Sequence, residues 1–371
     1  MHKKITVIHG DGIGPEVVKQ AVKVLDTVAE TYGHQFEYNR ALLGAEAIDA
    51  TGGPLPEDTV EKALNSDAVL FGAVGDPKYD NDPTAKIRPE QGILGIRKSL
   101  ELYANIRPIF TNPSLAHLSP VKIKSSGPID FLIYRELTGG IYFGDKGTTE
   151  EGTHAWDNCA YARNEIERIA HLAFHAATGR KKKLTLVDKA NVMETSRLWR
   201  KTCIEIAAQY PDVTLDFLFV DNAAQQIILN PEQFDVMLTE NLFGDILSDE
   251  ASVLTGSLGM LPSASIGNKS ALFEPIHGSY PQAAGKDIAN PVGAILSAAM
   301  MLDYFNLHTE AEVIRNATQW TLENGFVTKD IDPVNFYFTS TVSDLICDFI
   351  LGKVVEVINR DNVEARKSTI I

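Results

Sequence analysis

Short apolar runs of strand length alternate with helical patterns along most of this chain. Strands are predicted at ITVIH (5–9), AVLFGAV (68–74), LTLVD (184–188), VTLDFLFVD (213–221) and FDVMLTEN (234–241). Helical periodicity lies between these runs, from Pro15 to about Thr31 and over residues 164–177, 196–209 and 242–254. Such alternation predicts an α/β protein with a largely parallel sheet.

The middle of the chain departs from this alternation. Residues 104–145 contain the short β-rich pieces NIRPIF, IDFLIYREL and IYFGD, separated by Pro and Gly. This pattern indicates strands and hairpins, so we expect a second domain or an arm to begin near residue 103.

Composition excludes several classes of protein. The 371 residues carry a net charge of −15, which argues against a nucleic-acid-binding surface. The three cysteines form no CxxC pair, so neither a zinc site nor a disulfide framework is indicated. The longest apolar stretch, residues 294–302, is too short to span a bilayer, and the chain opens directly on a strand pattern without a leader. We therefore expect a cytoplasmic protein.

The stretch GDGIGP (10–15) poses the question of whether it is a dinucleotide fingerprint. The fingerprint GxGxxG/A needs a small third residue and an acidic residue about twenty positions later. Here Pro15 takes the place of that small residue, and only Glu37 stands near the acidic position. We therefore expect a tight β–α turn with Pro15 at the first helical position, and a cofactor, if one binds, elsewhere.

Carboxylates dominate the motif NLFGDILSDEAS. Asp245 and Asp249 are four residues apart on a predicted helix, so they share one face and need a compensating cation. Asp221, at the end of the apolar strand FLFV, is a third candidate, and three carboxylates suit Mg²⁺ or Mn²⁺. The alternative for the helical pair is two solvated carboxylates on an exposed face.

Arginines and two proton-transfer candidates stand in other motifs. Arg97, Arg107 and Arg135 are suited to grip carboxylates bidentately, although Arg97 also has the spacing for a surface pair with Glu101. Tyr142 follows a glycine pair, and Lys189 follows the strand LTLVD, where a lysine can take part in proton transfer.

The Gly- and Pro-punctuated loop of residues 274–291 has a composition that favours ligand contact, through His277, Gly278, Ser279 and Asn290.

Stretches from the start of the chain to about residue 303 combine into a specific pattern: GDGIGPEVV, LGAEAIDATGGPLPEDT, FGAVGDPKYD, GIRKSLELYANIRP, YRELTGGIYFG, VDKANVMETSRLWR, NLFGDILSDEAS and EPIHGS…GK.IANP. Together they resemble the β-decarboxylating dehydrogenases, the isocitrate/isopropylmalate dehydrogenase family. The resemblance implies a two-domain α/β fold that is not a Rossmann fold. Residues 1–102 and 256–371 would form the discontinuous, cofactor-side domain, and residues 103–255 the second domain, with the dimer interface and an arm.

The resemblance also implies a homodimer with shared active sites and assigns roles to residues. Tyr142, Lys189 and Asp221 would be catalytic, with Lys189 and Asp221 entering the neighbour's site. Asp245 and Asp249, joined by Asp221 of the other subunit, would bind Mg²⁺ or Mn²⁺. Substrate would be bound by Ile93, Arg97, Arg107, Arg135 and Asp221, and NAD would be contacted by Gly75, Glu90, His277, Gly278, Ser279, Gln282, Ile288 and Asn290.

The reaction that the resemblance implies is the NAD-dependent oxidative decarboxylation of 3-isopropylmalate to 4-methyl-2-oxopentanoate, a step of leucine biosynthesis. Ile93 favours this substrate, because isocitrate-type relatives place polar residues there. The alternatives are a relative acting on isocitrate, homoisocitrate or tartrate, and a Mg²⁺-dependent phosphate-handling enzyme or nucleotide-binding module. The absence of a P-loop motif GxxxxGK[ST] weighs against the last class.

Two stretches depart from the family pattern. Gln282-Ala283 stands where NAD-using members usually carry Asp-Ile and NADP-using relatives carry Lys and Tyr, and Tyr280 stands where Ala is common. Residues 329–344 lack the usual Asp-Leu-Gly-Gly. Both departures concern the expected contacts with the adenosine half of the cofactor.

Overall fold

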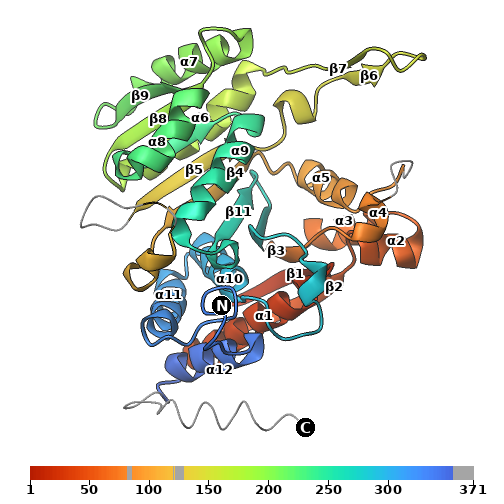
Figure 1. Ribbon diagram of the computed structural model, residues 1–371, viewed down its shortest axis with the longest axis vertical. Coiled ribbons are helices and arrows are strands. Elements are labelled where there is room, and N and C mark those ends of the chain that lie inside the picture. Colours follow the sequence, from red (N-terminus) through yellow and green to blue (C-terminus); the bar gives the residue numbers. More distant parts are fainter. Residues whose placement is uncertain (82–85, 120, 122–128, 354–371) are drawn as a thin grey trace. The chain divides into compact units, whose positions relative to one another are not determined.

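A computed structural model describes residues 1–81, 86–119, 121 and 129–353, and the chain divides into two compact units (Figure 1). Unit 1 runs from Met1 to Leu100 and takes in Ser257–Ala264 and the chain from Ser270 onwards. Unit 2 comprises Glu101–Gly256 and Ser265–Lys269. Among the described residues, no helix combines the length and apolar character needed to cross a membrane.

Unit 1 alternates strands and helices, as the sequence predicts. Its strands are β1 (His2–Gly10), β2 (Gln35–Ala41), β3 (Ala68–Ala73), β12 (Ala271–Pro275) and the first residues of β11 (Pro262–Ile266). Its α-helices are α1 (Gly14–Tyr32), α2 (Ala45–Thr51), α3 (Glu57–Leu64), α4 (Pro77–Asp80), α5 (Glu90–Ser99), α10 (Val292–Tyr304), α11 (His308–Glu323) and α12 (Thr339–Ile350). Two 3₁₀ turns, η5 (Leu258–Met260) and η6 (Pro281–Ala283), complete it.

The strands of unit 1 lie in the order β2-β1-β3-β12-β11, and β1 pairs in parallel with both of its neighbours. Every residue of β3 is buried, which agrees with its continuous apolar run. Helix α1 packs against α10 and α12, and α10 packs against α11 and β12 (Figure 1). This order differs from the 3-2-1-4 arrangement of a Rossmann sheet, as expected.

The GDGIG turn joins β1 to α1 at close quarters. A side chain at Gly10 would overlap the carbonyl oxygen of Ala73, and one at Gly12 would overlap that of Ser279. Both glycines have positive φ angles, of 69° and 58°. The glycines therefore serve close backbone packing, which agrees with the interpretation as a β–α turn. Pro15 occupies the second helical position rather than the expected first.

Unit 2 has the strands β4 (Ala104–Phe110), β5 (Asp130–Glu136), β6 (Lys146–Thr148), β7 (Ala155–Asp157), β8 (Lys183–Asp188), β9 (Thr214–Phe219) and β10 (Val236–Thr239). Its α-helices are α6 (Arg163–Thr178), α7 (Glu194–Ala207), α8 (Val220–Leu229) and α9 (Asn241–Ser252). Short 3₁₀ turns are η1 (Pro113–Leu118), η2 (Gly140–Tyr142), η3 (Pro231–Gln233) and η4 (Val253–Thr255).

The strands of unit 2 lie in the order β4-β5-β10-β8-β9, with β4 and β5 antiparallel and the other pairs parallel. Helix α9 packs on β4 and β5 and against α8, while α6 packs against α7 (Figure 1). A core around Trp199 fixes the unit, with Tyr161 meeting the indole edge-on at 5.4 Å. The strands β6 and β7 form a separate two-stranded antiparallel sheet.

Three strand predictions from the sequence are wrong, one in the existence of the strand and two in its bounds. The piece IYFGD forms no strand, because its glycine-rich start turns into η2 instead. The predicted strand 213–221 ends at Phe219, and Asp221 lies in the first turn of α8. The predicted strand 234–241 is shorter, because Glu240 caps α9 and Asn241 begins it.

Candidate active site

Helix α9 carries the predicted carboxylate pair. The Glu240 side chain accepts from the backbone N–H of Phe243 at 2.9 Å, which caps the helix at its N-terminus. Gly244 lets the helix approach β5, because a Cβ there would lie 2.6 Å from Cγ of Arg135. The prediction that Asp245 and Asp249 share a helix is confirmed.

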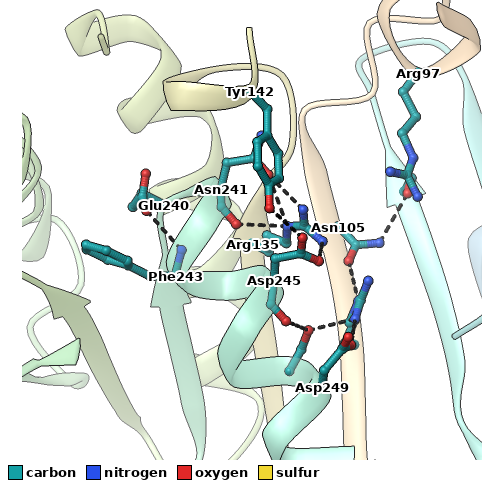
Figure 2. A network of polar contacts seen from close by, with 12 residues as sticks. Arg97, Asn105, Arg135, Tyr142, Glu240, Asn241, Phe243, Asp245 and Asp249 are labelled. Atoms are coloured by element: carbon teal, nitrogen blue, oxygen red, sulfur yellow. Dashed lines mark hydrogen bonds and ion pairs between the residues drawn. The ribbon is translucent and has the colours of Figure 1, made fainter. Parts of the chain in front are cut away.

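Arg135, near the end of β5, supplies the cation that Asp245 needs. Its Nη1 lies 2.5 Å from Oδ1 of Asp245, and its side chain is only 4% exposed. The Tyr142 hydroxyl donates to the other oxygen of the same carboxylate at 2.8 Å. Figure 2 shows the side chains of Arg135 and Tyr142 meeting at the Asp245 carboxylate.

Arg107, on β4, does the same for Asp249. Its Nη1 lies 3.0 Å from Asp249 Oδ1 and 2.7 Å from the Ser248 hydroxyl, and its Nε donates to Asn105 at 2.9 Å. Asn105 on β4 lies directly opposite Arg135 on β5. Arg107 is two residues after Asn105 and therefore points to the same face, so both arginines project from one face of the sheet. Each carboxylate of the pair therefore has an arginine partner, while Asp249 remains 68% exposed.

Tyr142 is held as a protonated phenol. Partial burial, together with the hydrogen bond and negative charge of Asp245, raises its pKa to about 12, against a smaller opposing influence of Arg135. The arrangement thus places a proton donor, a carboxylate and a guanidinium within contact of one another.

Lys189 and Asp221 form a second cluster in unit 2. Lys189 directly follows β8, and its Nζ lies 2.6 Å from Asp221 Oδ1. The hydrogen bond from Lys189 lowers the pKa of the Asp221 carboxyl. In the described part of the chain, no hydrogen bond or ion pair links these two residues to Tyr142 or Asp245, and Asp221 is 66% exposed.

Arg97 and Ile93 belong to helix α5 in unit 1. Arg97 pairs with Glu274 of β12 at 2.7 Å, so the alternative pairing with Glu101 is wrong; α5 ends before Glu101, which has a positive φ of 52°. The Nε of Arg97 is buried without a partner among the described residues. Ile93 is 6% exposed on the same helix.

Three of the expected cofactor residues meet in unit 1. Gly75 has a φ of 121°, and a Cβ there would lie 3.2 Å from Glu90 Oε1 and 3.4 Å from Ser279 Oγ. The backbone N–H of Gly75 donates to the buried Asp11 carboxylate at 2.9 Å, and Asp11 also accepts from the first amide of α2, that of Ala45. The loops after β1 and β3 are thereby fixed to one another.

His277 presents a neutral ring within the same loop region. Its Nδ1 donates to the carbonyl of Gly278 at 2.9 Å, and burial lowers its pKa. Its Nε2 is buried and has no hydrogen-bond partner among the described residues. An orphaned acceptor of this kind, beside Ser279, fits a ligand with donor groups.

The rest of the loop is hydrogen-bonded to α12 and to residues 329–344, the segment that differs from the family pattern. Asp287 accepts from the Ser340 amide at 2.9 Å, and Asn290 donates to Asp330 at 3.0 Å. Gln282 is exposed, Ile288 is half-buried, and Tyr280 is 55% exposed with a φ of 36°. Residues 329–344 thus support Asn290 from a sequence unlike the family's usual one.

Two carboxylates with hard oxygen atoms, Asp245 and Asp249, fit a small divalent cation, which often takes only one or two protein carboxylates. Among the described residues of one chain, no three His, Cys, Asp or Glu side chains group as a metal site. Asp221 therefore does not join the helical pair within the described chain.

Sequence reasoning missed two partners of these residues. Glu274 was not expected to pair with Arg97, because a contact across 177 positions leaves no local signal. Asn241 stands four residues before Asp245 in the same motif, and this spacing on a helix was a signal that the sequence did contain.

A family model described as isocitrate/isopropylmalate dehydrogenase matches residues 4–346. The chain belongs to this family. A 3-isopropylmalate dehydrogenase of Bacteroides fragilis is 52% identical over 352 residues, which cover 94% of this chain and 99% of that protein. One of Aquifex aeolicus is 54% identical, with 88% of this chain and 91% of that protein covered.

Solved structures of isocitrate/isopropylmalate dehydrogenase relatives share the fold. The crystal structure of isocitrate dehydrogenase from Methylococcus capsulatus superposes with a TM-score of 0.85 at 35% identity, covering 94% of this chain and 99% of that one. The expected fold class is thereby confirmed.

Proposed function

We propose that this chain oxidises 3-isopropylmalate with NAD and releases CO₂ to give 4-methyl-2-oxopentanoate, a step of leucine biosynthesis. The observation that carries the proposal is the Asp245 carboxylate, which is shared by Arg135 and Tyr142 in a chain that belongs to the dehydrogenase family. A buried guanidinium beside a proton donor is what a reaction on a dicarboxylate needs.

Substrate binding is assigned to the three arginines. Arg107 and Arg135 stand on one sheet face, beside the two carboxylates of α9. Arg97 offers a buried Nε with no partner among the described residues. Ile93 supplies the hydrocarbon surface for the isopropyl group, against which a further carboxylate would be desolvated at a cost.

The metal ion, Mg²⁺ or Mn²⁺, would be held by Asp245 and Asp249, with Asp221 of a second subunit as the third carboxylate. When bound, such an ion supplies Lewis-acid polarisation of substrate oxygens. NAD would be held by Gly75, Glu90, His277, Gly278, Ser279, Gln282, Ile288 and Asn290, and it supplies the hydride acceptor.

The proton steps are assigned to this chain's own residues. Lys189, paired with Asp221 at 2.6 Å, helps to remove the proton of the substrate hydroxyl as the hydride leaves carbon 2. Tyr142 carries a proton at neutral pH and delivers it to carbon 3, from which CO₂ has departed.

A homodimer is part of the proposal. Leu229 on α8, Ile246 on α9 and Val253 in η4 leave apolar surface on unit 2, being 60%, 59% and 48% exposed. A second copy would cover them, and unit 2 also carries the small β6–β7 sheet as an arm. The exposed Asp221 is then free to reach the neighbour's site.

The test is formation of NADH by purified protein mixed with 3-isopropylmalate, NAD and Mg²⁺, with parallel reactions on isocitrate, homoisocitrate and tartrate. We expect 3-isopropylmalate to be the preferred substrate and a chelator to stop the reaction. Higher kcat/KM on one of the other acids would transfer the assignment to that acid. Turnover of none of the four would overturn the proposal.

A further inference from the structure

Asn241, the first residue of α9, contacts Arg135 and the start of the loop that leads to Tyr142, and no role has been given to it so far. Its Oδ1 accepts from Arg135 Nε at 3.1 Å and from Nη2 at 2.9 Å, and its backbone carbonyl also accepts from Nε at 3.0 Å. Its Nδ2 donates to the carbonyl of Gly139 at 3.1 Å. Gly139 opens the short loop that ends at Tyr142.

These contacts close a ring of interactions. Asn241 and Asp245 are four residues apart on α9, so their side chains leave the same helix face. Arg135 donates hydrogen bonds to both Asn241 and Asp245, and Tyr142 donates to Asp245 (Figure 2). The loop that carries Tyr142 is bound in turn by Asn241, through the Gly139 carbonyl.

Several contacts hold the Tyr142 loop at its start, among them that of the Gly140 amide with the Ala160 carbonyl at 3.2 Å. Glu136, fully buried, accepts from the Gly139 amide at 2.7 Å, and Asn241 takes the Gly139 carbonyl. The ring of Tyr161 packs so closely that a Cβ at Gly139 would lie 2.7 Å from its Cε1. The Tyr161 hydroxyl in turn accepts from the backbone N–H of Asn241 at 2.9 Å, so the first residue of α9 contacts the supporting ring as well as the loop.

Asp245 and Asn241, the two α9 residues of this ring, differ in charge. Asp245 is a charged, one-third exposed carboxylate, and any cation that it binds competes with the guanidinium of Arg135. Asn241 is neutral and fully buried, so its contacts with Arg135 and Gly139 are not in competition with a cation. A neutral amide is therefore the part of the ring that can stay in place while Asp245 is engaged.

We infer that Asn241 is a positioning residue that holds Arg135 and the Tyr142 loop in their working geometry independently of Asp245. This inference rests on the proposed function for the roles of Arg135 and Tyr142. It predicts that the Nδ2 contact governs Tyr142, and hence kcat, while the Oδ1 contacts govern Arg135, and hence KM.

Two substitutions separate these contacts. Asn241→Asp keeps an acceptor for Arg135 but places an oxygen against the Gly139 carbonyl. Asn241→Leu removes both side-chain contacts and leaves Arg135 only the backbone carbonyl of residue 241. A negative charge at the first position of a helix is favourable, so Asn241→Asp should fold. Asn65→Asp is the matched control, because its Nδ2 also donates to a backbone carbonyl, that of Glu61, at 2.9 Å, outside the site.

In kinetic assays with 3-isopropylmalate, Asn241→Asp should lower kcat about 10- to 100-fold, the effect of displacing a reacting group by about 1 Å, with KM nearly unchanged. Asn241→Leu should also raise KM. In the Tyr142→Phe background, Asn241→Asp should lower kcat little further, because the effects of substitutions at groups that act together are not additive. Unchanged kcat in Asn241→Asp, or a full additive loss in the double variant, would overturn the inference.

Amide hydrogen exchange supplies a readout that does not need activity. Asn241→Asp should speed exchange over residues 138–144, where the Gly140 and Gly144 amides are hydrogen-bonded, and Asn65→Asp should not. Unchanged exchange would overturn the inference whether or not the enzyme turns over. If the wild-type protein leaves 3-isopropylmalate untouched, the proposed function falls, and faster exchange in Asn241→Asp alone still supports Asn241 as the anchor of the loop.

Discussion

Arg135 and Tyr142 share one acceptor, the Asp245 carboxylate, each on its own oxygen. The guanidinium donates to Oδ1 at 2.5 Å, and the phenol hydroxyl donates to Oδ2 at 2.8 Å. A carboxylate held between a cation and a hydroxyl donor is fixed in its orientation. This relationship couples the proposed metal ligand to a proposed substrate-binding residue and a proposed proton donor.

The first prediction concerns Asp245 as a metal ligand. Asp245→Asn should lower the affinity for Mg²⁺ and the activity together, by about 10- to 100-fold or more, since even supporting groups of metal sites are worth that much. Activity titrated against Mg²⁺ measures both effects. Asp344→Asn on α12, also a helical aspartate in an ion pair, is the control and should behave as wild type. Full activity of Asp245→Asn at limiting Mg²⁺ would refute the ligand assignment.

The second prediction concerns the proton-transfer groups. Tyr142→Phe and Lys189→Met should each lower kcat by about 10²–10⁴-fold, the usual value of one positioned acid or base. KM should change far less, because neither group is assigned to a substrate carboxylate. Steady-state kinetics with Tyr79→Phe as control, whose hydroxyl bonds Asp49 in unit 1, provide the comparison. Near-normal kcat in either variant returns that residue to a structural role.

The motif residues around α9 were predictable from the sequence because their spacing is local. Asp245 and Asp249 lie on one helix face at a separation of four residues, and periodicity alone indicates that. Their cations were not predictable by position, since Arg135 and Arg107 come from strands 110 and 142 residues away. The register of β4 and β5 in the sheet is what places both arginines next to α9.

Local sequence also failed where tertiary packing decides the backbone. IYFGD has strand-forming residues, yet Gly140 takes a φ of 72° and the segment turns beneath the Tyr161 ring. Glu240 and Asn241 extend an apolar strand pattern, but their polar groups cap and begin α9. In both places the close contact with another element overrides the local preference.

The third prediction tests the close approach of α9 to β5. Gly244→Ala would put a Cβ 2.6 Å from Arg135 Cγ, so it should destabilise the protein by about 1–3 kcal/mol, as overpacking does, and lower activity. Gly53→Ala meets nothing within 4 Å and is the matched control, with unchanged or slightly raised stability. Thermal unfolding measures both. Equal melting temperatures of the two variants would contradict the packing argument.

The fourth prediction concerns substrate choice at Ile93. Its apolar side chain on α5 gives no partner to a third carboxylate, so kcat/KM for 3-isopropylmalate should greatly exceed that for isocitrate. Ile93→Ser should narrow the ratio by losing the apolar contact. Leu94→Ser, one residue on and 39% exposed, should leave it unchanged, because adjacent helical residues face different directions. Comparable efficiency of the wild-type enzyme on both acids counts against the assignment.

The last prediction is a preference for NAD over NADP. A 2′-phosphate needs cations or several donors, whereas a free 2′-hydroxyl needs an acceptor. Gln282 is exposed and offers a carbonyl acceptor, but it lacks the negative charge by which an aspartate would repel a phosphate. Lys286, four residues on and also exposed, is the nearest cation in the loop sequence. We therefore expect NAD to be preferred by a modest margin, which Gln282→Asp should widen by weakening NADP binding. Gln319→Asp, on the exposed side of α11, is the matched control and should leave the ratio unchanged. Steady-state kcat/KM with both cofactors decides the matter: equal values, or NADP ahead, would refute the preference.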